Sequence, residues 1–149
     1  IILYEIIIVL LEKNTVISIE DLLKQHPKLK QLSGTTWNKF TKIAGVEKYI
    51  TFSRTELEWL DIKFKKESVD RIITSLPTSK NADLGKIYNE FFYQSDYILK
   101  KEGALALITR MPELAKKHAE KHNFSIVKEK KVWSGEQALN ILILKKKNI

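Results

Sequence analysis

The clearest pattern along the chain is an apolar, β-branched run that ends abruptly at a polar loop. Val69, Ile72 and Ile73 form the run, and Thr74 to Pro77 follow it. Such a run is typical of a buried strand, and serine and proline are typical of the loop that ends one. Ligands of parallel α/β sheets bind at the carboxyl ends of the strands. The stretch therefore predicts either a ligand-binding loop or a core strand followed by a plain turn.

Alternating strands and helices account for the rest of the pattern. The predicted strands cover residues 15–19, 46–52, 69–73, 104–108, 124–133 and 137–144. The predicted helices cover residues 27–44, 84–100 and 112–122, with a short helix capped by Thr55. The opening segment, Ile1 to Lys13, is compatible with a strand, because isoleucine dominates it, or with a buried helix.

Local signals mark several of these boundaries. Asp83 is a good N-cap for the second long helix, and Pro112 suits the first turn of the third. Lys101-Glu102-Gly103 predicts a turn, and Ser134-Gly135-Glu136 predicts a tight connection between two antiparallel strands. The alternation predicts one α/β domain over residues 1–149, with a mostly parallel sheet, helices on both faces and an antiparallel C-terminal hairpin.

Composition adds weaker constraints. The chain has 149 residues and a net charge of +8, which favours polyanionic partners but also fits a lysine-rich solvated surface. It has no cysteine, which excludes disulfides and thiolate ligands and favours an intracellular protein. The expected location is cytoplasmic. The opening apolar segment is too short to span a membrane. His118 and His122 lie four residues apart, but no carboxylate follows His118, so we predict no metal site.

Four stretches follow one another in a fairly specific order and spacing. They are NKFTKIAGVEKYITF (Asn38–Phe52), VDRIITSLPTS (Val69–Ser79), IYNEFFYQSDYILKKEGALALIT (Ile87–Thr109) and FSIVKEKKVWSGEQALNILILKK (Phe124–Lys146). Together they resemble class I S-adenosylmethionine-dependent methyltransferases, and most closely the THUMP-containing RNA methyltransferases that modify guanine N2 of tRNA. The resemblance implies a Rossmann-like sheet, S-adenosylmethionine as cofactor and RNA, with tRNA favoured, as substrate.

The resemblance also implies roles for particular residues. Ser75-Leu76-Pro77-Thr78 stands at the motif that accepts hydrogen bonds from the exocyclic amine of the substrate base. Glu20 stands where the group's acidic residue holds the cofactor ribose, and Glu56 stands where an acidic residue binds the adenine amino group. Positioning is the main contribution that such a motif makes to methyl transfer.

Two departures from the group's pattern affect these expectations. The motif's asparagine is Ser75 here, and its aromatic residue is Thr78, which cannot stack on a base. The resemblance leaves Tyr88, Phe91 or Tyr93 as replacements for the missing ring, with core packing favoured for Phe91. The first strand and its glycine-rich loop have no counterpart, because Ile1–Leu11 aligns with the helix that follows that loop. A THUMP region or a partner chain would then supply the missing strand.

Three interpretations follow from the sequence. The first is an S-adenosylmethionine-dependent RNA methyltransferase domain that acts on an exocyclic base amine. The second is a catalytically degenerate methyltransferase-like domain that binds RNA or protein. The third is an α/β domain of another class, such as a nucleotide-binding module. A glycine-rich loop upstream of Ile1 in the complete gene would favour the first.

Overall fold

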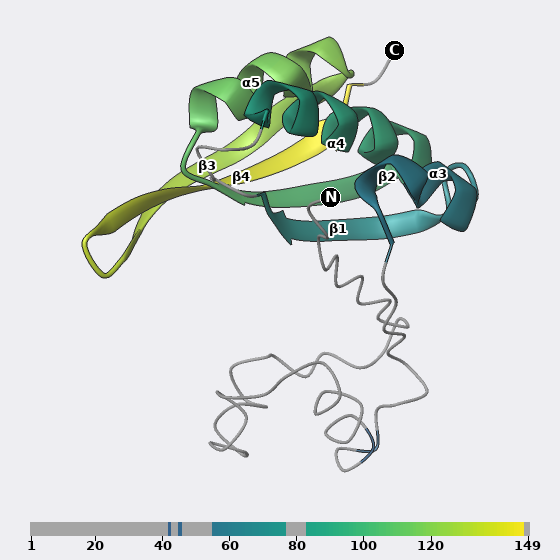
Figure 1. Cartoon of the computed structure of the whole chain (residues 1–149), viewed down its shortest axis with the longest axis horizontal. Coiled ribbons are helices and arrows are strands. Elements are labelled where there is room, and N and C mark those ends of the chain that lie inside the picture. The colour runs from purple at the N-terminus through teal and green to yellow at the C-terminus, as the bar shows by residue number, and fades with distance from the viewer. Residues whose placement is uncertain (1–41, 43–44, 46–54, 77–82, 148–149) are drawn as a thin grey trace. The chain divides into compact units, whose positions relative to one another are not determined.

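The computed structural model describes residues 42, 45, 55–76 and 83–147 (Figure 1). Apart from residues 42 and 45, these residues belong to one compact unit. The described elements are η3 (Leu57–Trp59), α3 (Leu60–Lys63), β1 (Val69–Ser75), α4 (Leu84–Ile98), β2 (Leu99–Thr109), α5 (Pro112–Lys121), β3 (Phe124–Ser134) and β4 (Gln137–Lys146). The elements predicted before residue 55 lie outside the described residues, so the prediction of a single domain over the whole chain stays a prediction.

The four strands form one mixed sheet in the order β1-β2-β4-β3. β1 and β2 are parallel, whereas β4 is antiparallel to both of its neighbours, β2 and β3. This confirms the predicted Rossmann-like sheet with a parallel pair, a closing hairpin and an antiparallel last strand between its neighbours, whereas the other predicted parallel strands lie outside the described residues. The turn of the hairpin contains Gly135 at φ 61°, a left-handed conformation that glycine adopts without strain.

The described helices lie on one face of this sheet (Figure 1). On that face Leu105 and Leu107 of β2 and Leu142 and Leu144 of β4 are fully buried. They pack with the inner sides of α3, α4 and α5 in one core. Its other members are Leu57, Leu60, Val69, Ile72, Leu76, Tyr88, Phe91, Phe92, Ile98, Leu99, Ala115, Ala119 and Phe124. The predicted helices of a second layer fall outside the described residues.

Two local predictions are corrected. The short helix near residue 57 begins after Glu56, which occupies the N-cap, and not after Thr55. Lys101-Glu102-Gly103 is not a turn between a helix and a strand, because β2 already begins at Leu99. The pairing jumps from Val69↔Leu99 to Arg71↔Ala104, so these residues form an irregularity within β2. A Cβ on Gly103 would lie 2.7 Å from Leu99 Cδ1, which explains the glycine at this close approach.

Candidate active site

The carboxyl end of β1 carries the first two residues of the predicted amine-binding motif. Ser75 pairs in register with Ile108 of β2, and its side chain is exposed. Leu76 turns back into the core and is only 8% exposed. Pairing with β2 fixes Ser75, and burial in the core fixes Leu76. The chain therefore leaves the sheet at a defined point, with the Ser75 hydroxyl in solvent.

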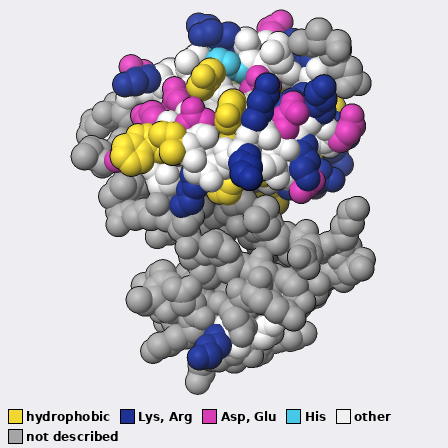
Figure 2. Space-filling view, turned by 90° about the vertical axis from the view of Figure 1, so that its right-hand side faces the viewer, with side chains coloured by type: hydrophobic (Ala, Val, Ile, Leu, Met, Phe, Trp, Pro, Cys, Tyr) yellow, Lys and Arg dark blue, Asp and Glu magenta, His cyan; other side chains and the backbone are white. Residues whose placement is uncertain are grey.

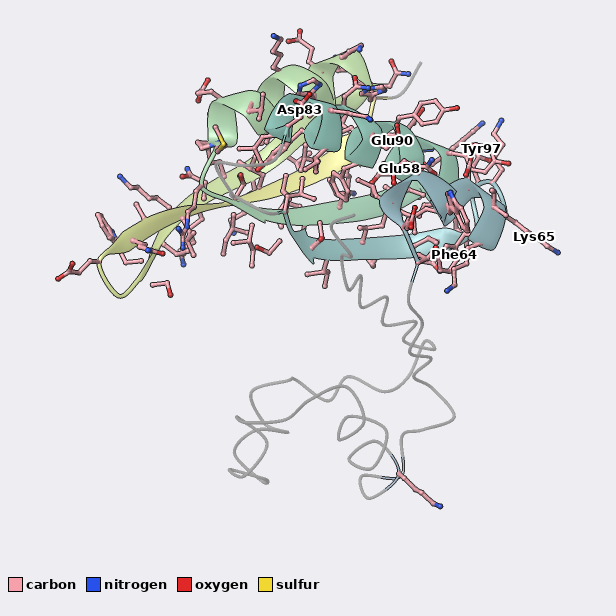
Figure 3. The ribbon with its side chains drawn as sticks, in the orientation of Figure 1. Glu58, Phe64, Lys65, Asp83, Glu90 and Tyr97 are labelled. Carbon is pink, nitrogen blue, oxygen red and sulfur yellow. The ribbon has the colours of Figure 1, made fainter. Side chains whose placement is uncertain are left out.

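Asp83, at the start of α4, is the next described residue after Leu76. Asp83 occupies the N-cap, and its Oδ1 accepts a hydrogen bond of 3.0 Å from the backbone nitrogen of Lys86 (Figure 3). Leu76 and Asp83 thus bracket residues 77–82, which include Pro77 and Thr78 and lie outside the described residues, as does Glu20. A loop from the end of a parallel strand to the start of a helix is where α/β sheets bind ligands.

The carboxyl end of β2, beside β1, is held by a buried hydrogen bond between two hydroxyls. Tyr88 Oη of α4 lies 2.5 Å from Thr109 Oγ1, and Thr109 Oγ1 also accepts from the backbone nitrogen of Met111 at 2.8 Å. Burial raises the pKa of Tyr88, and the hydrogen bond to Thr109 opposes that rise in part. Sequence reasoning missed this pair, although a tyrosine on the apolar side of a helix needs a polar partner for its hydroxyl.

This arrangement corrects the expectation for Tyr88 and Phe91 as replacements for the missing stacking ring. Tyr88 is fully buried and Phe91 is only 2% exposed, so neither ring can stack on a substrate base. Tyr93 is 53% exposed, but its ring lies edge-on to His122 at 6.2 Å between centroids, beside the end of α5. Tyr88 and Phe91 therefore serve the core, and Tyr93 remains the one exposed candidate among the three.

Glu56, the predicted adenine-binding residue, is half-buried and precedes η3. Its backbone oxygen accepts from the backbone nitrogen of Trp59 at 3.1 Å, whereas its side chain makes no capping hydrogen bond. Gln94 of α4 holds η3 and α3 in place. Its Nε2 donates to the backbone oxygen of Glu58 at 3.0 Å, and its Oε1 accepts from the backbone nitrogen of Asp61 at 2.8 Å (Figure 3). The hydrogen bonds of the described residues do not join Glu56 to Ser75.

His118 of α5 and His122, the C-cap residue that follows this helix, are both half-buried. His122 Nε2 lies 3.1 Å from Asn89 Oδ1 of α4, and His118 Nδ1 is buried without a hydrogen-bond partner. Burial, followed by nearby lysines, lowers the pKa of both imidazoles.

Among the described residues, no group of three or more histidine, aspartate and glutamate side chains is arranged to hold a metal ion. No helix in the described part of the chain has the length and apolarity needed to cross a membrane.

Comparison with known proteins gives structural neighbours only. No family model and no curated protein sequence matches the chain. TrmN from Thermus thermophilus matches with a TM-score of 0.65 and 25% identity, over 73% of this chain and 32% of TrmN. The m1A22 tRNA methyltransferase TrmK of B. subtilis matches with a TM-score of 0.59 and 12% identity, over 77% of this chain and 47% of TrmK.

A third neighbour acts on a different class of substrate. The geranyl diphosphate C-methyltransferase of Streptomyces coelicolor A3(2), in complex with S-adenosyl-L-homocysteine, matches with a TM-score of 0.55 and 9% identity, over 73% of this chain and 58% of that enzyme. The described sheet therefore has the fold of class I S-adenosylmethionine-dependent methyltransferases. The chain spans about one third of TrmN and half of TrmK. The fold serves several substrates, so the substrate has to be argued from the chain's own residues.

Proposed function

We propose that the chain is part of an S-adenosylmethionine-dependent RNA methyltransferase that acts on an exocyclic base amine, with guanine N2 of tRNA as the favoured target. The observation that carries the proposal is the position of Ser75 and Leu76 at the carboxyl end of a parallel strand, with the Ser75 side chain exposed. The similarity to TrmN and to the tRNA methyltransferase TrmK supports it.

The proposed chemistry needs two acceptors and little else from this motif. The Ser75 hydroxyl and the Leu76 backbone carbonyl would accept the two N–H bonds of the substrate amine. That arrangement holds the amine with its lone pair directed away from the strand and toward the methyl donor. The bound cofactor would supply a methyl group activated by a positively charged sulfur. Pro77 and Thr78 would shape the wall of the pocket beyond these acceptors.

The cofactor roles of Glu20 and Glu56 are part of the same proposal. A carboxylate accepts hydrogen bonds from ribose hydroxyls and from the adenine amino group, which suits Glu20 and Glu56 respectively. The side chain of Glu56 is not used as a helix cap, which is consistent with a carboxylate kept for a ligand. A THUMP region or a partner chain would complete the sheet and help to bind tRNA, and we expect the protein in the cytoplasm.

A second candidate function has one specific observation in its favour. The motif lacks its aromatic residue, and Tyr88 and Phe91 are both buried in the core. Loss of base stacking costs about 1–3 kcal/mol at the pocket for the substrate base, whereas binding of RNA or protein elsewhere on the domain does not need that ring. A catalytically degenerate domain that still binds RNA or a protein is therefore the alternative.

The deciding experiment restores the motif in the protein made from its complete gene. We expect the double variant Ser75→Asn with Thr78→Tyr to transfer labelled methyl groups to tRNA faster than the wild type. The lost amide acceptor is worth about 0.5–1.5 kcal/mol and the lost stacking about 1–3 kcal/mol. If both act on the transition state, the gain is about ten- to two-thousand-fold at 1.36 kcal/mol per decade.

A matched control and two outcomes complete the experiment. Ser125→Asn changes a serine at the start of β3, away from the end of β1, and should leave the rate unchanged. A fast wild type with a slower double variant would mean that Ser75 and Thr78 belong to a differently built pocket. If neither protein transfers methyl groups while both bind tRNA, the degenerate binding domain is the correct function.

A further inference from the structure

The β3–β4 hairpin extends well beyond the rest of the sheet (Figure 1). β4 pairs with β2 only as far as Asn140, opposite Thr109, whereas β3 and β4 stay paired to Ser134↔Gln137. Three further residue pairs of the hairpin therefore have no β2 neighbour on their inner side. At about 3.3 Å per residue, this outer part of the hairpin projects roughly 10 Å past the end of β2.

The projecting end lies at the same end of the sheet as the candidate active site. Ser75 of β1 is opposite Ile108 of β2, and Ile108 is opposite Ile141 of β4. From Ile141 the chain of β4 runs backward through Asn140 to Gln137, which is beyond the level of Ser75. The hairpin and Ser75 thus lie toward one end of the sheet, separated laterally by β2.

The outer hairpin presents an aromatic ring to solvent. Trp133 is 66% exposed, and the residue opposite it on β4 is the small Ala138. The Nζ atom of Lys131 lies 5.3 Å from the centroid of the Trp133 ring. A tryptophan that is neither buried nor packed against a large neighbour contributes little to folding, so its exposure needs another explanation.

Basic side chains precede this ring on both faces of β3. Lys128, Lys130 and Lys131 are all exposed, and strand alternation places Lys131 on the same face as Trp133 and the other two on the opposite face. Glu129, between them, is already paired with Lys116 of α5 at 3.1 Å. The exposed Glu136 lies in the turn.

A fourth cation links the hairpin to the sheet. Arg110 follows β2 directly and donates a hydrogen bond from Nη2 to Gln137 Oε1 at the base of the hairpin turn. At the opposite end of the molecule, lysine and arginine side chains lie among aspartate and glutamate side chains (Figure 2). Positive charge and an exposed ring therefore occur together at the hairpin.

We propose that the outer β3–β4 hairpin, together with the adjoining residues 128–131 of β3, is a docking platform for a single-stranded segment of the RNA substrate. This inference rests on the proposed function, because it assigns the RNA contact next to the methyl-transfer site. The Trp133 ring stacks on an unpaired base, and Lys128, Lys130, Lys131 and Arg110 neutralise phosphates on either side. An aromatic ring flanked by cations fits single-stranded nucleic acid better than a protein surface, which would need a larger apolar area.

The test measures RNA binding by fluorescence anisotropy, using the protein made from its complete gene and a labelled single-stranded RNA oligonucleotide. Trp133→Ala should weaken binding about 5- to 140-fold, since stacking of one base is worth about 1–3 kcal/mol. Trp133→Phe should restore part of the loss. A duplex RNA of the same length should lose much less on Trp133→Ala, because its bases are already stacked on each other.

The contribution of the lysines is measured from the salt dependence of RNA binding. Lys128→Gln, Lys130→Gln and Lys131→Gln together should lower the dependence of log Kd on log salt by about 2, at roughly 0.7 for each phosphate contact on a single strand. The control is Trp59→Ala, which removes another exposed ring, 57% exposed, on η3. It should leave RNA affinity and salt dependence unchanged.

The outcomes separate this proposal from the proposed function. If Trp133→Ala binds and methylates RNA like the wild type, the platform is wrong while the methyltransferase function stands. Loss of RNA binding by the hairpin variants in a protein that transfers no methyl groups would support the platform and reject the enzyme. A wild-type protein that binds no RNA, or hairpin variants that lose only a protein partner, would overturn the platform.

Discussion

The two faces of the sheet are built from the same strands but differ sharply in exposure. Under α4 and α5, Leu107 of β2 and Leu142 of β4 are fully buried. On the other face Ile73 of β1 is 67% exposed, and its cross-strand neighbours Ala106 and Ile143 are only half-buried. An apolar residue in a strand is therefore not buried by its own character. It is buried where another element covers it, and the described helices cover one face.

The largest expected effect comes from truncating one side chain on each face. Leu107→Ala should lower the free energy of unfolding by about 2–5 kcal/mol, because it leaves a cavity beneath the helices. Ile73→Ala should cost at most about 1 kcal/mol, which is the span of strand propensity, because its side chain is already in solvent. Urea unfolding of both variants measures the difference. Equal losses of unfolding free energy would mean that the two faces are packed alike, which would contradict the difference in exposure between them.

This contrast also shows how far the sequence could predict the fold. From residue 69 onward, the four strands, their order along the chain and the hairpin were predicted correctly, because Ile, Val and Leu runs and the glycine turn are local signals. The prediction that Ile73 belongs to a buried strand was wrong on its face of the sheet. Periodicity identifies a strand, whereas its covering depends on elements far away in the chain.

The irregularity in β2 has a similar explanation. Lys101-Glu102-Gly103 has the composition of a turn, and nothing local distinguishes a turn from a bulge. The pairing of Val69 with Leu99 draws these residues into the strand. The pairing with β1 therefore sets the start of β2, which the local sequence pattern does not determine.

The candidate site was predictable only in part. The exposed Ser75 at the end of a parallel strand follows from the pattern around it, and the structure places it there. The Tyr88–Thr109 pair was not predictable, because it joins a helix and a strand end that are 21 residues apart. Pro77, Thr78 and Glu20 lie outside the described residues, so their roles stay proposals.

A medium effect is expected from the polar anchor on the helix-covered side. Gln94 is 1% exposed and pairs with the backbone of Glu58 and Asp61. Gln94→Leu keeps the volume but leaves those backbone groups without a partner, so we expect a loss of about 1–3 kcal/mol in thermal or urea unfolding. Glu90→Ala removes only the third partner of Gln94, a side chain at 2.9 Å. Glu90→Ala should lower the free energy of unfolding less than Gln94→Leu does. A larger loss for Glu90→Ala would show that the hydrogen bonds of Gln94 to the backbone are not its stabilising contacts.

The smallest effect concerns His118 of α5 and His122, the C-cap residue that follows this helix. Burial and neighbouring lysines lower the pKa of both imidazoles in the folded protein. In the unfolded chain both imidazoles titrate with a pKa of about 6.5. As the pH falls below that value, the unfolded state binds protons that the folded state resists, so stability should fall until the lower folded pKa is reached. We expect the urea midpoint to drop between pH 7.5 and 5.5, with pH values chosen at about one unit on either side of the unfolded pKa. His118→Gln should reduce that drop, since it removes one of the two groups. A His118→Gln variant with the full wild-type drop would assign the pH dependence to other groups of the chain.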